Sequence, residues 1–273
     1  MLPLINRPFL KWAGGKRLLT PKISQSLPDG NRLIEPFVGA GSVFLNCHFP
    51  KYILSDINQD LINIYQILQK DAGNFVDLAS QYFTADHNKE SQYYLLREHF
   101  NQLPMGSERA AIFLYLNRHG FNGLCRYNQA GGYNVPYGKY LKPYFPEKEM
   151  HFFAKRASNA VFYCQDFVQV MKKAKKDTVI YCDPPYVPLN KTAYFTQYAQ
   201  AVFGVKQQQK LAQLALSLRE KGISTVISNH DNEVTRALYK EAEIESFYVQ
   251  RTISCEGSTR NKVKELLAVY RGK

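Results

Sequence analysis

The sequence has few of the features that mark secreted, metal-binding or membrane-spanning proteins. Its five cysteines are an odd number, are scattered, and include no Cys-x-x-Cys pair, which argues against both a disulfide framework and a zinc site. The longest apolar run, residues 110–116, is far shorter than the ~18 residues that a membrane helix needs. The first residues show no basic segment leading into an apolar stretch. We therefore expect a cytoplasmic protein with no membrane segment, no signal peptide and no metal.

Acidic side chains are also scarce, because 35 Lys and Arg residues stand against 23 Asp and Glu residues, for a net charge of +12. A surplus of this size suggests a polyanionic partner but does not identify it. The hydrophobic content of 45% is ordinary for a globular chain. A length of 273 residues suits one large domain, or a core with a smaller insert.

Short apolar runs that end beside a polar residue recur along the chain. We predict strands at 32–35, 52–56, 160–164, 178–182 and 224–228. Strands that alternate with helical patterns favour an α/β fold, in which polar residues at the carboxyl ends of the strands share one ligand-binding edge. Two further runs, 247–253 and 263–270, flank a polar loop and predict a C-terminal antiparallel hairpin. The expected fold is a Rossmann-like sheet of seven strands.

This alternation stops between the second and third predicted strands. Residues 60–118 predict helices, with Leu61, Ile64 and Leu68 at helical spacing. Residues 118–146 then hold five of the 16 glycines, seven aromatic residues, four basic residues and no acidic residue. A long irregular segment of this composition inside a compact fold indicates a function. We predict an inserted module over 61–146, within a domain formed by 1–60 and 147–273.

The run Glu35-Pro-Phe-Val-Gly-Ala-Gly-Ser42 leads from a strand into a Gly-x-Gly turn, where glycine permits close approach of a ligand. The dinucleotide fingerprint needs a third glycine, but Phe44 takes its place, and Glu35 would repel a phosphate. The pattern therefore favours S-adenosylmethionine (AdoMet), which carries a sulfonium and no phosphate. Asp56 ends the next strand, where an acid can accept hydrogen bonds from ribose hydroxyls. Acids at strand ends are common in α/β proteins, so Glu35 and Asp56 alone do not establish an AdoMet site.

The tetrad Asp183-Pro-Pro-Tyr186 follows a predicted strand. Its two prolines fix φ and have no N–H, so their carbonyls and the Asp183 carboxylate can point at one donor. The exocyclic amine of adenine or cytosine could donate its two protons there, which would localise its lone pair toward a methyl sulfonium. Tyr186 would stack on the base, and the chemistry requires no metal. The alternative is a rigid turn between a strand and a helix.

Together, these segments resemble a Dam-type DNA adenine-N6 methyltransferase of the D12 class, alpha group. The segments that match, in the order of the family, are Phe9–Lys16, Leu33–Asn46, Ser55–Asn58, Tyr115–Asn128, Phe145–Pro146, Asp183–Tyr186 and Ile227–Asp231. The most specific of them continues from Asn122–Asn128 into Asn134–Tyr140. The resemblance implies methyl transfer from AdoMet, leaving S-adenosyl-L-homocysteine, to N6 of an adenine flipped out of double-stranded DNA at 5′-GATC-3′. Nothing in the sequence indicates an obligate protein partner.

The resemblance also implies roles for individual residues. Cofactor contacts are expected from Trp12, Lys16, Glu35, Phe37, Gly39, Gly41, Asp56, Asp166, Phe167 and Asp183. Contacts to the flipped adenine are expected from Asp183, Pro184 and Tyr186. DNA contacts are expected from Lys11, Arg118, Phe121, Asn122, Leu124, Arg126, Pro136, Lys139 and Tyr140. Lys and Arg suit guanine O6 and N7, and Leu or Pro suits a thymine methyl. Where the family tends to carry Tyr, this chain has Phe121, which keeps an intercalating ring without its hydroxyl.

Three other functions remain open at this point. An RNA or protein-glutamine methyltransferase would share the cofactor motifs but lack the 118–144 signature. A cytosine-N4 enzyme usually has Ser in place of Asp183, and a silent DNA-binding regulator would need a broken tetrad.

Residues 187–204 are also predicted to form a lid that orders on substrate binding. The sequence does not distinguish repair marking, gene regulation, restriction and a phage role.

Overall fold

The computed structural model describes residues 5–186, 203–250 and 262–273. The chain forms two compact units, which we treat separately. Unit 1 comprises Met1–Pro21, Val38–His48 and Asp56–Cys164, and unit 2 comprises Lys22–Phe37, Phe49–Ser55 and Gln165–Lys273. Most of the predicted lid and the loop of the predicted hairpin lie outside the described residues. The proposed boundaries of the inserted module stay a prediction.

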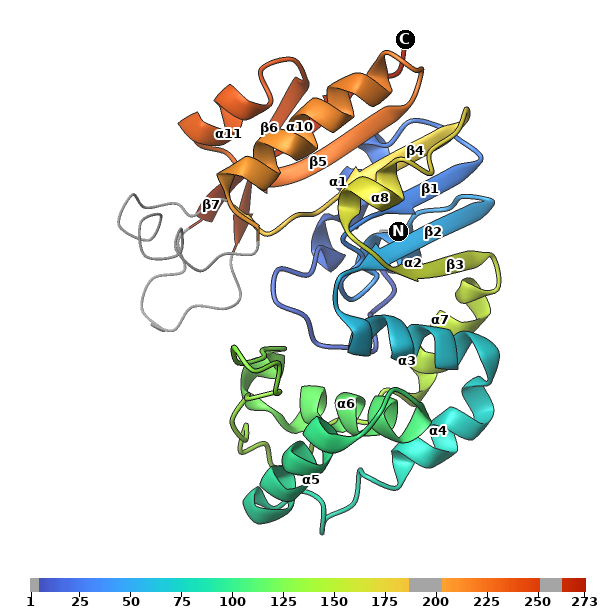
Figure 1. The fold of residues 1–273 in the computed structure, drawn as a ribbon, viewed down its shortest axis with the longest axis vertical. Helices are drawn as coiled ribbons and strands as arrows, with labels where there is room; N and C mark the ends of the chain where they lie inside the picture. The colour runs from blue at the N-terminus through green and yellow to red at the C-terminus, as the bar shows by residue number, and fades with distance from the viewer. Residues whose placement is uncertain (1–4, 187–202, 251–261) are drawn as a thin grey trace. The chain divides into compact units, whose positions relative to one another are not determined.

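The described strands form one mixed sheet of seven strands in the order β3-β2-β1-β4-β5-β7-β6 (Figure 1). Their bounds are β1 Arg32–Glu35, β2 Lys51–Asp56, β3 Ala160–Cys164, β4 Thr178–Cys182, β5 Ser224–His230, β6 Glu243–Gln250 and β7 Lys262–Tyr270. β1 pairs in parallel with β2 and β4, and β4 pairs in parallel with β5. β7 runs antiparallel to both β5 and β6. This arrangement confirms the α/β class and the C-terminal hairpin, although β6 begins at Glu243, four residues before the predicted start.

The strand order places a switch point between β1 and β4 in unit 2. From β1 the chain goes on to β2 on one side, whereas β4 and β5 follow on the other side. Ligands of open α/β sheets bind outside the carboxyl ends of the strands at such a point. Glu35 ends β1 and Asp183 directly follows β4, so the topology alone brings these two carboxylates to neighbouring strand ends.

The helices of unit 2 flank this sheet. They are α1 (Thr20–Ser26, which begins at the boundary with unit 1), α8 (Phe167–Met171), α10 (Val205–Arg219) and α11 (Glu233–Leu238). α10 packs against β5 and β7 and buries Leu211, Ala215 and Leu218, which recur at helical spacing on one face. It also buries the polar Gln208 at its first turns, a position that serves the site described below.

Unit 1 consists largely of helices, as the sequence predicts for residues 60–118. They are α2 (Ser42–Asn46), α3 (Gln59–Lys70), α4 (Ala72–Ser80), α5 (Glu90–Gln102), α6 (Ser107–His119) and α7 (Glu147–Ala157), with short 3-10 turns η1 (Arg17–Leu19) and η2 (Phe121–Gly123). α3 begins where the Asn58 side chain accepts a hydrogen bond from the Leu61 N–H. α6 contacts α3, α4 and α5, and every residue from Ala110 to His119 is buried. Because α6 is surrounded, its last turn carries polar residues into the interior.

Candidate functional site

The Asp183-Pro-Pro-Tyr186 tetrad lies in unit 2, at the carboxyl end of β4, and begins with a carboxylate held by the neighbouring strand. Ser228 of β5 donates a hydrogen bond from Oγ to Asp183 Oδ1 at 2.8 Å. The hydroxyl of Tyr181 in turn donates to Ser228 Oγ at 3.1 Å. Burial and the adjacent Asp183 carboxylate raise the pKa of Tyr181, so this hydroxyl remains a donor at neutral pH. The relay from Tyr181 through Ser228 fixes one carboxylate oxygen of Asp183.

The rest of the tetrad is held by α10, β5 and β7. Gln208 donates from Nε2 to the Pro185 carbonyl at 2.8 Å, whereas no described residue donates to the Pro184 carbonyl. The Tyr186 hydroxyl donates to Glu265 Oε2 at 3.1 Å. The Tyr186 ring lies edge-on against the His230 ring, with the ring centroids 4.7 Å apart. Burial, followed by the charges of nearby carboxylates, raises the pKa of Tyr186. An acidic oxygen, a proline carbonyl and a neutral aromatic ring are therefore presented at one strand end.

An aromatic cluster lies in the same unit. Phe37, two residues after the buried Glu35, stacks on Phe167 with ring centroids 5.5 Å apart and an angle of 27°. Phe203 packs edge-on against both rings, at 5.3 and 5.5 Å. Asp166 caps α8, because its Oδ1 accepts from the Val168 N–H at 2.9 Å. Aromatic surface together with strand-end carboxylates suits a nucleoside that carries positive charge better than one that carries phosphate.

The Gly-x-Gly turn lies in unit 1 and is fixed from both sides. The Gly39 N–H donates to Asp56 Oδ2 at 3.1 Å, and the Tyr65 hydroxyl donates to the Gly39 carbonyl at 2.5 Å. Gly39 has a φ of +47°, and a Cβ there would meet the Trp12 ring at 3.0 Å, so the turn requires glycine. Gly41, with φ +73°, precedes α2. Trp12, Gly39 and Asp56 are thus brought together in unit 1, as their assignment to one ligand requires.

Two charged groups of unit 1 complete this set. Asp56 Oδ1 accepts from the Asn58 N–H at 3.0 Å, and burial raises the pKa of Asp56. Lys16 is buried and donates from Nζ to the Gly14 carbonyl at 2.7 Å. The Asp56 carboxylate therefore faces the Gly-x-Gly turn, and Lys16 is hydrogen-bonded within the loop that begins at Trp12.

Residues 120–140, which we call the recognition segment, fold back on themselves in unit 1. Isolated bridges join Gly120 to Tyr137 and Tyr127 to Tyr133. Arg126 is exposed, and Asn134 holds its guanidinium through hydrogen bonds of 2.8 and 3.1 Å. The sharp turn at η2 leaves the Phe121 side chain 47% exposed. Of the other predicted contacts, Asn122, Pro136 and Lys139 are exposed, and Leu124 and Tyr140 are half-buried.

Lys11 joins the recognition segment from a distant part of unit 1. Its main chain pairs with the Asn117 side chain at 2.9 and 2.8 Å, and a Cβ at Gly123 would overlap the Lys11 side chain. Its ammonium donates to the Arg118 carbonyl at 3.3 Å and lies 3.9 Å from the centroid of the Tyr140 ring. Burial, Arg118 and Arg7 lower the pKa of Lys11 to about 8.

Arg118, which the sequence analysis predicts as a DNA contact, is buried in unit 1. The residue is only 2% exposed, because it belongs to the last turn of the fully surrounded helix α6. Its guanidinium lies 5.4 Å from the centroid of the Tyr144 ring, and burial lowers the pKa of Arg118 to about 10. Composition correctly indicated a basic segment, but it could not show that this charge points inward. We do not retain Arg118 as a DNA contact.

A partly buried polar network links Asp56 to the recognition segment within unit 1. Asn58 donates from Nδ2 to Cys125 Sγ at 3.4 Å, next to Arg126. The Tyr127 hydroxyl donates to Asp60 Oδ2 at 2.6 Å. Arg109 Nε donates to Asp60 Oδ1, also at 2.6 Å. The base of the recognition segment is thereby anchored to the start of α3.

Several residues of this arrangement were missed by sequence reasoning. Ser228 and His230 lie in the matched segment Ile227–Asp231, but no role was assigned to either of them. Gln208 lies in an ordinary amphipathic helix, and Glu265 lies in a strand that reads as the second arm of a hairpin. Only the fold brings these two residues to the tetrad.

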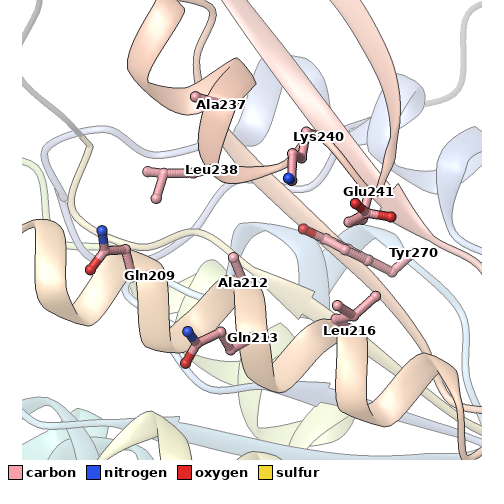
Figure 2. Close-up of a pocket in the computed structure, with 9 residues that line it drawn as sticks. All are labelled: Gln209, Ala212, Gln213, Leu216, Ala237, Leu238, Lys240, Glu241 and Tyr270. Carbon is pink, nitrogen blue, oxygen red and sulfur yellow. The ribbon is translucent and has the colours of Figure 1, made fainter.

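A separate hollow of about 420 Å³ lies in unit 2 between α10, α11 and the end of β7 (Figure 2). Gln209, Ala212 and Leu216 line it from α10, and Tyr270 from β7. None of its lining residues is a predicted site residue, so we do not assign the active site to it.

Comparison with known proteins then decides the family. Residues 12–253 match the family described as D12 class N6 adenine-specific DNA methyltransferase. The chain belongs to this family. It is 51% identical over 266 residues to a DNA adenine methylase of Escherichia coli K12, covering 97% of this chain and 96% of that one. For the DNA adenine methylases of Serratia marcescens and Vibrio cholerae, the identities are 52% and 50%, covering 97% of this chain and 99% and 96% of theirs.

The protein is thus an adenine-specific DNA methyltransferase, which requires a methyl donor and acts on DNA. Within the described residues, no cluster of His, Cys, Asp and Glu suits a metal ion, and no helix is long and apolar enough to cross a membrane. A solved structure of precorrin-8W decarboxylase from Methanobacterium thermoautotrophicum aligns over both whole chains at 10% identity and a TM-score of 0.41, a likeness too remote to carry a conclusion.

Proposed function

We propose that this methyltransferase transfers the methyl group of AdoMet to N6 of an adenine flipped out of duplex DNA within GATC. The observation that carries the proposal is the Asp183–Tyr186 tetrad at the switch point of the sheet. Its carboxylate is held by Ser228 and its aromatic ring by Glu265. A tetrad serving only as a turn would not need a hydroxyl relay to one carboxylate oxygen.

The proposed chemistry rests on two acceptors of unit 2. The Asp183 carboxylate and the Pro184 carbonyl accept the two N6 protons of the adenine, which concentrates the nitrogen lone pair away from the ring. AdoMet, when bound, supplies a methyl group activated by its sulfonium. As the new N–C bond forms, Asp183 stabilises the positive charge on N6 and takes up the proton that the nitrogen loses. The Tyr186 ring stacks on the base and sets its orientation.

The cofactor assignment follows the chemistry of the residues. In unit 1 we assign it to Trp12, Lys16, Gly39, Gly41 and Asp56, and in unit 2 to Glu35, Phe37, Asp166, Phe167 and Asp183. The buried Glu35 carboxylate disfavours a phosphate-bearing cofactor and favours a cationic one. Asp56 suits ribose hydroxyls, and the stacked Phe37 and Phe167 rings offer an apolar surface to an adenine. Of these features, the carboxylate at Glu35 is the one that a phosphate-binding dinucleotide site would not share.

For the recognition of GATC we assign Lys11, Phe121, Asn122, Leu124, Arg126, Pro136, Lys139 and Tyr140. Lys11 and Arg126 can each donate to the O6 and N7 acceptors of guanine. The exposed Phe121 ring can fill the space that the extruded adenine leaves. The hydrogen bonds from Arg126 to Asn134 set the guanidinium before DNA arrives, which lowers the entropic cost of binding.

The test is to incubate the protein with methyl-labelled AdoMet and duplexes that contain GATC or a singly altered site, and to map the labelled base. We expect N6-methyladenine at GATC. Asp183→Ala should abolish transfer while the variant still binds the duplex. Transfer to cytosine, or turnover by Asp183→Ala, would refute the proposed chemistry.

The recognition of the GATC bases has its own test. Arg126→Ala should relax discrimination at one guanine by about 1–3 kcal/mol and leave discrimination at the other positions unchanged. A variant whose relative activity on all singly altered sites equals that of the parent would remove Arg126 from the readout.

A further inference from the structure

Three basic side chains meet at the amino-terminal edge of the sheet in unit 2, the edge opposite Asp183. Lys51 starts β2, Arg32 starts β1, and Lys176 lies two residues before β4. These strands are adjacent in the sheet. The three side chains line one hollow of about 300 Å³, together with Asn31, Pro50 and Asp177. Segments far apart in the sequence thus converge on one basic surface, which we call the basic edge.

The register makes this arrangement costly on its own. Arg32 is the direct cross-strand partner of Lys51 on one side and of Thr178 on the other. Like charges directly opposite each other on neighbouring strands are destabilising. Asp177 is the one acid that lines the hollow, so three positive charges face a single negative charge. An anion bound in the hollow would relieve this repulsion.

The contrast with other cations at the same end of the sheet supports this reading. Arg271 and Lys273, which follow β7, pair with Glu243 and Glu220 at 3.0 and 2.6 Å. In the described part of the chain, none of Arg32, Lys51 and Lys176 forms an ion pair with a carboxylate. In the described residues, these three cations therefore line one hollow without forming an ion pair, whereas Arg271 and Lys273 each form one.

The lysine run 172–176 extends the same surface. α8 ends at Met171, and the run leads from there to β4, with Lys172, Lys175 and Lys176 exposed. The run is therefore not only the solvated end of a helix, because its last member shares a hollow with cations of two other strands. Further exposed lysines thus precede the hollow in the sequence, and no aromatic residue is among those that line it.

We propose that the basic edge binds the phosphate backbone of a second DNA segment while the active site holds the first. DNA is the polyanion that this enzyme meets as its substrate, and the lining offers cations but no aromatic group on which an unpaired base could stack. β4 separates this edge from Asp183 by about 15 Å along the strand, so a duplex at the carboxyl edge does not occupy it. Binding there is independent of sequence and goes beyond the proposed function, since it requires only that DNA be the substrate.

A bridging experiment tests this proposal. The full-length protein is first bound to an immobilised duplex that contains GATC, and a fluorescent duplex without GATC is then added at increasing salt. We expect capture of the second duplex, with a slope of log affinity against log salt of about −2.7 for three phosphate contacts. Lys51→Gln with Lys176→Gln should reduce the magnitude of this slope by about 2 and abolish capture at physiological salt, while methylation of a short GATC duplex is unchanged.

The matched control changes two exposed lysines of unit 1, Lys70→Gln with Lys155→Gln, which removes the same net charge. Capture that persists in this control but is lost in the Lys51 and Lys176 variant supports the basic edge. Absence of capture by the parent protein, or equal loss in both variants, would overturn the proposal. Thermal melting of each variant separates lost binding from lost folding. A failure of GATC methylation would appear on the first duplex alone and would leave the bridging readout interpretable.

Discussion

Ser228 provides the sharpest test of how the tetrad works, because its hydroxyl contacts Asp183 but is itself 1% exposed and shielded from solvent. Ser228→Ala removes the donor that lies 2.8 Å from Asp183 Oδ1 and leaves the backbone of β5 in place. The carboxylate then loses a hydrogen bond that helps to orient it. If Asp183 must accept a proton of the adenine amine in one geometry, this change slows the chemical step without affecting DNA affinity.

The magnitude follows from the type of bond. A hydrogen bond to a charged group contributes about 1.5–3 kcal/mol, and each 1.36 kcal/mol corresponds to a factor of ten in rate, so kcat should fall about 10- to 150-fold. The same change leaves the buried Tyr181 hydroxyl without its acceptor, at a cost of about 1–3 kcal/mol in the free energy of unfolding. Loss of activity and loss of stability therefore arise from one substitution and must be separated.

Tyr181→Phe separates them. Alone, it keeps the bond from Ser228 to Asp183, so kcat should stay within about threefold of the parent value. Combined with Ser228→Ala, it removes the stranded hydroxyl and should restore most of the lost stability without restoring kcat. The assays are single-turnover methylation and urea unfolding of the four proteins. If kcat recovers in parallel with stability in the double variant, Ser228 only supports the fold and does not position Asp183.

Three further predictions concern unit 1. Gly39→Ala should lower the free energy of unfolding by about 1–2 kcal/mol and weaken AdoMet binding in calorimetry, since φ is +47° and a Cβ would press on Trp12 at 3.0 Å. An unchanged affinity for AdoMet would show that this turn does not contact the cofactor. The pKa of Lys11 is lowered to about 8, so affinity for GATC duplexes in fluorescence anisotropy should fall from about pH 7 to about pH 9, whereas Lys11→Arg should show a flat profile because arginine stays charged. Asp60→Asn should lower the free energy of unfolding by about 3–5 kcal/mol in urea titrations, because it leaves the Arg109 guanidinium buried without its partner; a loss below 1 kcal/mol would show that other acceptors suffice.

The elements that the sequence predicted well are those with a local signal. The predicted parallel strands end at or beside a polar residue, and the buried run Thr178–Cys182 was placed to the residue because Pro184 and Pro185 cannot continue a strand. The start of β6 was placed too late, since Glu243 and Glu245 are acids in a strand whose exposed positions tolerate charge. Alternation of apolar and polar residues, the only local signal of such a strand, is weakest there.

The candidate site was predictable only in its motifs. Glu35 and Asp183 could be placed at strand ends from the sequence, but Gln208 and Glu265 reach the tetrad through the crossover of α10 and the antiparallel return of β7. Arg118 shows the opposite failure, because a charge count treats buried and exposed charges alike. Side chains that act across a sheet or inside a helix bundle carry no signal within a sequence window.

Two asparagines explain why unit 1 joins segments that the sequence had divided between two domains. Asn117 pairs with both main-chain groups of Lys11, and its Nδ2 also lies 3.4 Å from the Gly123 carbonyl. Asn58 caps α3 by accepting from the Leu61 N–H, while its main-chain N–H donates to Asp56 and its Nδ2 donates to Cys125. Each asparagine therefore ties a segment with a proposed cofactor residue to the recognition segment. Because a shielded polar group that loses its partner is costly, these bonds hold the two segments together within unit 1.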